Sequence, residues 1–305
     1  MFGYSWADLG SILVMQGFSG LSLFSVLLLM ALGLAIIFGQ MGVINMAHGE
    51  FMAIGAYTTV FISGFAVKYH LVEYYFVFAI IAAFVVAFIA GYLVEYVMIR
   101  HLYKRPLDTL LATWGLSLIL QQTFRSTFGP KEVSAVLPDW LLGSFHLSDL
   151  VDIPINGVFV LVLAFVVTFG VYLFMFRSRF GLKMRATVQN RTMAGAVGIN
   201  TAKVDRLTFA LGCGVAGVAG AAFTTIASTG PTTGSLYIVD SFMVVVFGGA
   251  GSLIGTIASA FGIAQAQSIL QFFMTSSMGK VSTLMVIVGI LMLRPEGLFA
   301  SKLRK

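Results

Sequence analysis

Long runs of apolar side chains recur along the whole chain and limit its fold more than any other feature. A helix needs roughly 20 residues to cross about 30 Å of hydrocarbon. Eight runs approach or exceed that length, at residues 21–39, 49–67, 74–99, 107–128, 155–176, 206–229, 252–273 and 279–293. With 59% hydrophobic and 10% charged residues, the chain cannot be a soluble domain. We predict one all-α polytopic membrane domain over residues 1–305.

A ninth apolar run is too short to cross a membrane. Residues 237–247 extend about half-way at about 1.5 Å per residue, and they end at a glycine cluster. Glycines permit a tight reversal, so this run predicts a re-entrant half-helix whose turn contains Gly248, Gly249 and Gly251. A helix hairpin packed for purely structural reasons is the alternative.

The basic residues indicate the topology. Most of the 18 lysines and arginines fall within residues 100–105, 177–206 and 294–305, which the positive-inside rule assigns to the cytoplasm. The N-terminus is then outside and the C-terminus inside, provided that residues 237–273 enter and leave on one face. Residues 1–20 lack the pattern of a cleavable signal peptide and are predicted to form an amphipathic segment on the outer surface. The acidic residues 129–153 also fall outside.

Polar residues interrupt the chain between its first two apolar runs. Asn45, His48 and Glu50 lie there without a charged partner in either flank. Ionisable groups at membrane depth are costly, so we predict that they line a solute pathway. Alternatively, Asn45 only caps the next helix and Glu50 only complements its positive end. Asp240 and Ser241, at the start of the half-helix, are further pathway candidates.

The loop at residues 177–205 contains a candidate contact site for another protein. Its centre, residues 190–197, predicts a short helix ended by Gly198, with Met193, Ala194 and Val197 on one small apolar face. Such a helix suits a groove on a cytosolic partner. A basic loop that rests on anionic lipid fits the composition equally well.

Motifs of catalysis are missing from the sequence. It has no phosphate-binding Gly-x4-Gly-Lys-Ser/Thr, no His-Glu-x-x-His and no Gly-x-Ser-x-Gly. The lone Cys213 excludes a cysteine metal cluster and an intrachain disulfide. We therefore predict no catalytic site, no metal and no cofactor. Energy must come from a gradient, as in a channel or secondary transporter, or from a partner protein.

Three separated segments carry a family resemblance. Residues 42–50 (GVINMAHGE), 246–252 (VFGGAGS) and 294–299 (RPEGLF) resemble the branched-chain amino acid (Liv-type) family of ABC importer permeases. The likeness runs from about residue 17 to residue 300. It implies a bacterial inner-membrane permease that pairs with a second, related permease as a heterodimer, with two cytosolic ATPase subunits and with an extracytoplasmic solute-binding protein.

The resemblance also bears on coupling and on substrate. In this family the inner loop docks on the ATPase, which assigns coupling to Asn190, Arg191, Thr192, Met193, Ala194 and Gly198, although the acidic anchor of the usual pattern is missing here. Two stretches, residues 184–193 and 239–249, look most like urea importer permeases. The predicted solute is therefore urea. A branched-chain amino acid or a short-chain amide is the alternative within the family.

Overall fold

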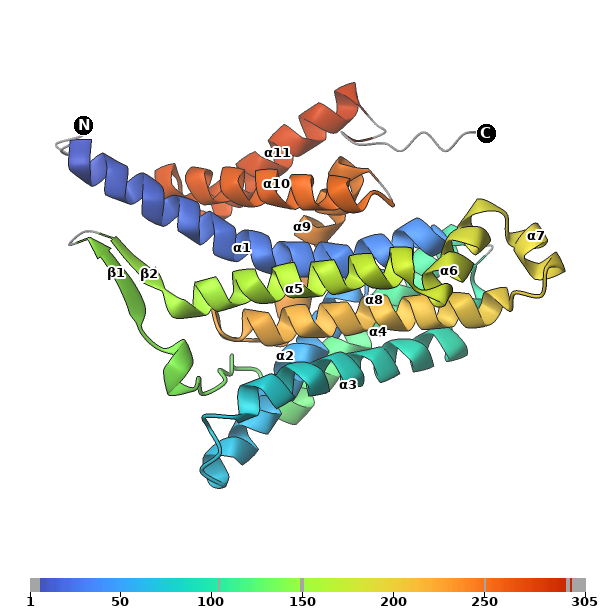
Figure 1. Cartoon of the computed structure of the whole chain (residues 1–305), viewed down its shortest axis with the longest axis horizontal. Coiled ribbons are helices and arrows are strands. Elements are labelled where there is room, and N and C mark those ends of the chain that lie inside the picture. The colour runs from blue at the N-terminus through green and yellow to red at the C-terminus, as the bar shows by residue number, and fades with distance from the viewer. Residues whose placement is uncertain (1–5, 104, 149–150, 250, 295–296, 298–305) are drawn as a thin grey trace.

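The computed structural model describes residues 6–103, 105–148, 151–249, 251–294 and 297. Most of the chain is helical (Figure 1). The long helices are α1 (Trp6–Met41), α2 (His48–Lys68), α3 (Tyr75–Val97), α4 (Pro106–Phe128), α5 (Ile155–Arg177), α8 (Thr201–Phe223), α9 (Thr233–Gly248), α10 (Leu253–Phe273) and α11 (Ser276–Leu293). Shorter elements are α6 (Arg179–Gln189), α7 (Arg191–Ala196), the 3₁₀ turns η1 (Ile99–His101) and η2 (Asp139–Leu141), and an antiparallel hairpin of β1 (Ser144–Ser148) and β2 (Val151–Pro154).

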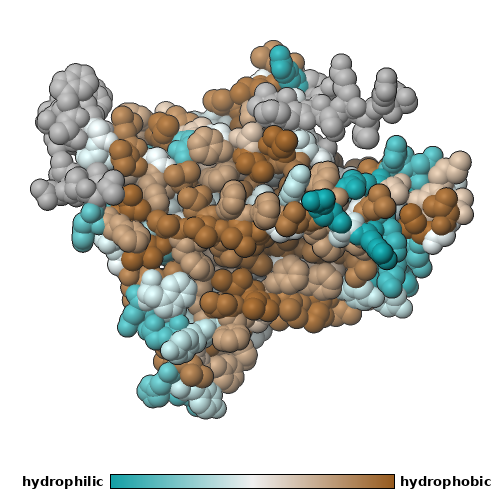
Figure 2. Space-filling view, in the orientation of Figure 1, coloured by the Kyte–Doolittle hydropathy of each residue, from teal (hydrophilic) through white to brown (hydrophobic). Residues whose placement is uncertain are grey.

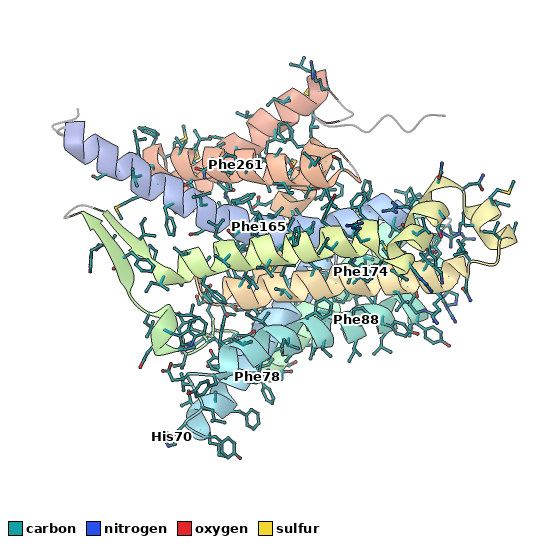
Figure 3. All side chains as sticks on the ribbon, in the orientation of Figure 1. His70, Phe78, Phe88, Phe165, Phe174 and Phe261 are labelled. Atoms are coloured by element: carbon teal, nitrogen blue, oxygen red, sulfur yellow. The ribbon has the colours of Figure 1, made fainter. Side chains whose placement is uncertain are left out.

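The bundle has two different ends. The β1–β2 hairpin lies at one, which we call the hairpin end, and α6 and α7 project from the other, the α7 end (Figure 1). Between them the surface is mostly apolar, with hydrophilic residues gathered toward the ends (Figure 2). Exposed aromatic side chains such as Phe78 and Phe165 point away from the helices in this middle band (Figure 3). An apolar belt between polar ends is the surface of a protein that spans a bilayer.

The predicted all-α polytopic fold is confirmed. Seven of the described helices are long and apolar enough to cross a membrane, and α9 is a shorter apolar helix. The eighth predicted span, residues 107–128, forms α4. This helix has 23 residues but is less apolar than the other seven. The β1–β2 hairpin is a small β addition that the sequence did not suggest.

Residues 6–20 do not form a separate amphipathic segment, because they are the first turns of α1. Their polar groups bond α10: the Gln16 amide donates to the Ser268 carbonyl oxygen at 2.5 Å. The Ser268 hydroxyl donates to the Gln16 carbonyl oxygen at 2.8 Å, and the Gln265 amide donates to the Gly17 carbonyl oxygen at 3.2 Å. The polarity that suggested a surface helix thus serves contacts between helices.

Helix α9 and its glycine turn reach the C-terminal end of α1. With 16 residues, α9 extends about 24 Å. It ends at Gly249, whose φ of +89° favours glycine, and Gly251 follows with a φ of +83°. A Cβ atom on Gly39, in the last turn of α1, would lie 2.9 Å from the Cα of Gly251. Since α10 then returns beside α1 toward Gln16, α9 and α10 form a helix hairpin whose turn lies at the C-terminal end of α1.

Helix α8 is the centre of the bundle. It is the most deeply buried of the helices that could span a membrane. It packs on α1, α2 and α3, and its contacts with α1 and α2 bring backbone against backbone. A Cβ atom on Gly55 of α2 would lie 2.0 Å from the Gly217 carbonyl oxygen of α8, and one on Gly33 of α1 would lie 2.4 Å from the Gly212 carbonyl oxygen. Only glycine fits at such crossings.

Valine at position 55 should therefore separate α2 from α8. We expect Gly55→Val to lower the free energy of unfolding of the purified protein by about 1–3 kcal/mol or more, because overpacking typically costs this much. Gly64→Val, on an exposed position of the same helix with no atom within 4 Å of its Cβ site, is the matched control. Thermal unfolding in detergent measures both. Equal melting temperatures would contradict the proposed packing.

Candidate functional site

The chain between α1 and α2 turns back along α1. The His48 imidazole donates through Nε2 to the Met30 carbonyl oxygen at 3.2 Å, although α1 continues to Met41. Those 11 residues of helix correspond to about 16 Å. Residues 42–47, which are not helical, therefore run back beside α1, and α2 begins well inside the bundle. Asn45, His48 and Glu50 are all buried there.

Asn45 closes this turn but does not cap α2. Its side-chain oxygen accepts a hydrogen bond from the Ala47 backbone N–H at 3.0 Å, a short-range bond that asparagine commonly makes in turns. Ala47 is the N-cap residue of α2, and its side chain makes no capping hydrogen bond. Helix capping therefore does not account for the three polar residues of this segment.

Glu50 points at α4. Its Oε1 accepts hydrogen bonds from the Ser117 hydroxyl at 3.0 Å and from the Gln121 amide at 2.9 Å. The Gln121 amide also donates to the Ser117 hydroxyl oxygen at 3.0 Å. Among the described residues, no lysine or arginine forms an ion pair with Glu50. Two neutral donors therefore hold this buried carboxyl group.

Ser117 and Gln121 belong to a polar stripe that the sequence analysis missed. Thr109, Thr113, Ser117 and Gln121 are spaced four apart and share one face of α4. Thr113 accepts a hydrogen bond from the Met46 backbone N–H at 3.1 Å, so the stripe also reaches the turn before α2. The four-residue spacing was visible within the predicted span 107–128. It is the signal that could have revealed these residues.

Aromatic rings continue the contact toward the hairpin end. Tyr57 lies two helical turns after Glu50 on the same face of α2. Its ring stacks on Phe124 and Phe128 of α4, with centroid distances of 4.9 and 4.4 Å. Helices α2 and α4 therefore meet through polar side chains and a three-ring stack.

Several buried polar atoms of α2 and of the turn before it have no hydrogen-bond partner among the described residues. They are Asn45 Nδ2, His48 Nδ1, Glu50 Oε2 and Tyr57 Oη. Each unsatisfied buried polar atom costs about 1–3 kcal/mol. Of these, Glu50 Oε2 and Tyr57 Oη belong to side chains that meet α4, so that contact has capacity for an additional polar partner.

The structure does not join all five predicted pathway residues. His48 points at α1, where a Cβ atom on Gly33 would lie 3.2 Å from its ring. Asp240 forms an ion pair with Lys280 of α11 at 3.1 Å. Ser241 donates to the Tyr237 carbonyl oxygen of its own helix at 2.8 Å. Asp240 and Ser241 therefore make local contacts in α9 and α11, and Glu50 meets α4 instead.

Glu50 is buried at the contact between α2 and α4. Two cavities formed by described residues, of about 480 and 850 Å³, lie elsewhere, and both are lined by α1, α5 and α10. Neither includes Glu50 or the α4 stripe. The described residues also contain no cluster of His, Cys, Asp and Glu suited to a metal ion.

Helix α7 forms where the loop helix was predicted. The Asn190 side chain accepts a hydrogen bond from the Met193 backbone N–H at 3.0 Å, and Gly198, with φ of +85°, follows the helix end. Met193 and Val197 are 64% and 76% exposed, whereas Ala194 is 3% exposed. Ala194 therefore faces the protein itself. The prediction that it shares the free face of the helix with Met193 and Val197 is wrong. Thr192 is also exposed, and the side chain of Arg191 is half exposed.

Long apolar helices around a buried polar site, with helices projecting at one end, define a multi-pass membrane permease. A family model described as "Branched-chain amino acid transport system / permease component" matches residues 17–294, and the chain belongs to this family. Relatives of the chain are named as permease proteins of branched-chain amino acid transport systems.

Named relatives cover nearly the whole chain. The high-affinity branched-chain amino acid transport system permease protein LivH of Salmonella typhimurium is 27% identical over 93% of this chain and 94% of its own length. LivH of Escherichia coli K12 has the same identity and coverage. BraD of Pseudomonas aeruginosa is 28% identical, over 92% of this chain and 93% of its own. No solved structure matches the chain.

Removal of a hydrogen-bond donor to Glu50 should weaken the contact between α2 and α4. We expect Gln121→Leu to destabilise the protein by about 1–3 kcal/mol, because one donor to a buried carboxyl group disappears. Gln122→Leu, at the exposed neighbouring position of α4, is the matched control and should leave stability nearly unchanged. Thermal unfolding compares the two. A similar small shift in both variants would show that the Gln121 bond does not hold α4.

Proposed function

We propose that this chain is the conducting subunit of a binding-protein-dependent ABC importer and carries a small solute with N–H donors between α2 and α4. Glu50 is the observation on which the proposal rests. It is buried, one oxygen is held by two neutral donors, and Oε2 has no partner among the residues that the structure describes. A carboxylate oxygen accepts N–H donors strongly, so a solute with an amino or amide group can bind there in passing.

The proposed direction of transport follows from the two ends of the bundle. The first two basic segments meet at the α7 end, where the Arg191 guanidinium lies 5.6 Å from the centre of the Tyr103 ring. A cytoplasmic α7 end leaves the hairpin and residues 129–153 outside, where the solute-binding protein would dock. The N-terminus would then be outside and the C-terminus inside. Two cytosolic ATPases would act at α7, and a second, related permease would complete the membrane domain.

Relatives and site chemistry favour different solutes. The relatives are named for branched-chain amino acids, which makes such an amino acid the first candidate. Its ammonium group could pair with Glu50. A carboxylate would then also need a cationic partner, and none of the described lysines and arginines is paired with the Glu50 site.

Urea is the second candidate, because the site is acceptor-rich and its other groups are neutral. Urea has four N–H donors and one carbonyl group. The free Glu50 oxygen and the hydroxyl and amide groups of the α4 stripe suit a neutral molecule of this kind without a compensating cation. Transport assays with both solutes distinguish the candidates.

The transport prediction uses the complete transporter in vesicles with its binding protein. We expect ATP-dependent uptake of labelled leucine or urea, and we expect Glu50→Gln to reduce it at least about tenfold per assembled complex, since a hydrogen bond to a charged group contributes about 1.5–3 kcal/mol. Glu73→Gln, in the exposed loop before α3, is the control. Uptake that persists without ATP, or that follows an imposed proton gradient, would favour a channel or secondary transporter.

Docking of α7 has a separate test. We expect Val197→Arg to weaken binding of the ATPase subunits and to abolish solute-stimulated ATP hydrolysis, because a long charged side chain would stand on the exposed tip that enters the ATPase groove. Leu182→Arg, at an exposed position of α6, is the control. Co-purification of the ATPases and their hydrolysis rate are measured together. Unchanged values in Val197→Arg would exclude α7 as the docking element.

A further inference from the structure

Two buried carboxyl groups lie at the α7 end of the bundle. The side chains of Glu95 on α3 and Asp205 on α8 are wholly buried. The Arg206 guanidinium donates through Nε to Glu95 Oε2 at 2.8 Å, and the Arg191 guanidinium donates to Asp205 Oδ2. Arg191 is the first residue of α7. An ion pair therefore joins α7 directly to a membrane helix.

Tyr103 connects the two ion pairs. Its hydroxyl donates to Glu95 Oε1, and its ring lies under the Arg191 guanidinium at 5.6 Å. Burial and the neighbouring Glu95 carboxylate raise the pKa of Tyr103 well above its usual range, so it remains a donor. The charged cluster of Arg191, Asp205, Tyr103, Glu95 and Arg206 thus forms one unit that ties α7 to α3 and α8.

The cluster also touches the approach to the Glu50 site. The Gln40 side chain, in the last turn of α1, lies beside the Asp205 carboxylate. Residues 42–47 follow directly and lead back into the bundle to His48 and Glu50. A displacement of Asp205 is therefore a displacement next to the chain segment that positions Glu50.

We propose that the Arg191–Asp205 pair is the connection through which movement of α7 reaches the membrane helices, which makes both of them positioning residues for transport. The inference rests on the proposed function, in which the ATPase subunits bind α7 and move it. Met193 and Val197 face outward, and Arg191 at the helix start faces inward to Asp205. A force applied to the exposed side of α7 is transmitted by this side chain into α8.

The chemistry of the pair suits transmission better than stabilisation. Buried ion pairs contribute little net stability because desolvation offsets their attraction, but they constrain geometry. The guanidinium both donates to Asp205 and lies over the Tyr103 ring, 5.6 Å from its centre, and these two contacts restrict its direction. The Arg105–Asp108 pair, also near this end, differs in these respects: its atoms are 3.5 Å apart and neither side chain is buried.

Asp205→Asn is the most direct test, because it removes the ion pair while Arg191, whose side chain is half exposed, can turn to water. In the complete transporter we expect ATPase binding and basal ATP hydrolysis to be retained, with uptake per complex reduced at least about tenfold and solute-stimulated hydrolysis lost. Asp108→Asn is the matched control and should leave all four measurements unchanged. Arg191→Lys should keep more uptake than Arg191→Gln, since lysine retains the positive charge although it lacks the planar guanidinium group.

Unchanged uptake and stimulation in Asp205→Asn would overturn the inference. A loss of uptake that only follows a loss of assembled complex would overturn it too, because the role would then be structural. Failure of the proposed function is distinguishable from both outcomes, since the wild-type complex itself would then show no ATP-dependent uptake of either solute.

Discussion

The close approach of backbones around α8 is the constraint on which the rest of this structure depends. Lipid chains are as apolar as leucine, so membrane helices gain most from tight packing, and glycine allows the tightest. Gly212 and Gly217 bring α8 against α1 and α2 at distances that no other residue permits. These contacts fix the start of α2 inside the bundle. They thereby place Glu50 at a depth that a connecting loop would not otherwise reach.

Helix α4 is attached by a different kind of contact. It meets α2 through hydrogen bonds to Glu50 and Met46 and through the stack of Tyr57 on two phenylalanines. Hydrogen bonds can exchange with a polar solute or with water at modest cost, whereas backbone packing between glycines cannot. The chain therefore combines a tightly packed group of helices with one helix held by exchangeable bonds. The polar site lies between these two parts.

Charged residues serve different purposes at the two depths. Within the bundle, Glu50 is held by neutral groups and keeps an oxygen available. At the α7 end, Asp205 and Glu95 are each matched by an arginine and joined through Tyr103, so their role is to hold helices in fixed relation. Burial is similar in both places. The difference in partners separates a site that can accept a ligand from one that maintains a geometry.

The sequence by itself determined the features that depend on local composition. Apolar runs of sufficient length dictated membrane helices, and Asn190 and Gly198 marked the limits of α7, because these signals act within a few residues. Only the tertiary structure decided which faces meet. Glu50 accepts hydrogen bonds from Ser117 and Gln121, which are 67 and 71 residues further along the chain. Asp240 pairs with Lys280 and does not join the Glu50 site, and Ala194 faces inward. A helix that is apolar on every side gives little indication of its neighbours, so the partner of each buried polar group is set by the packing of distant segments.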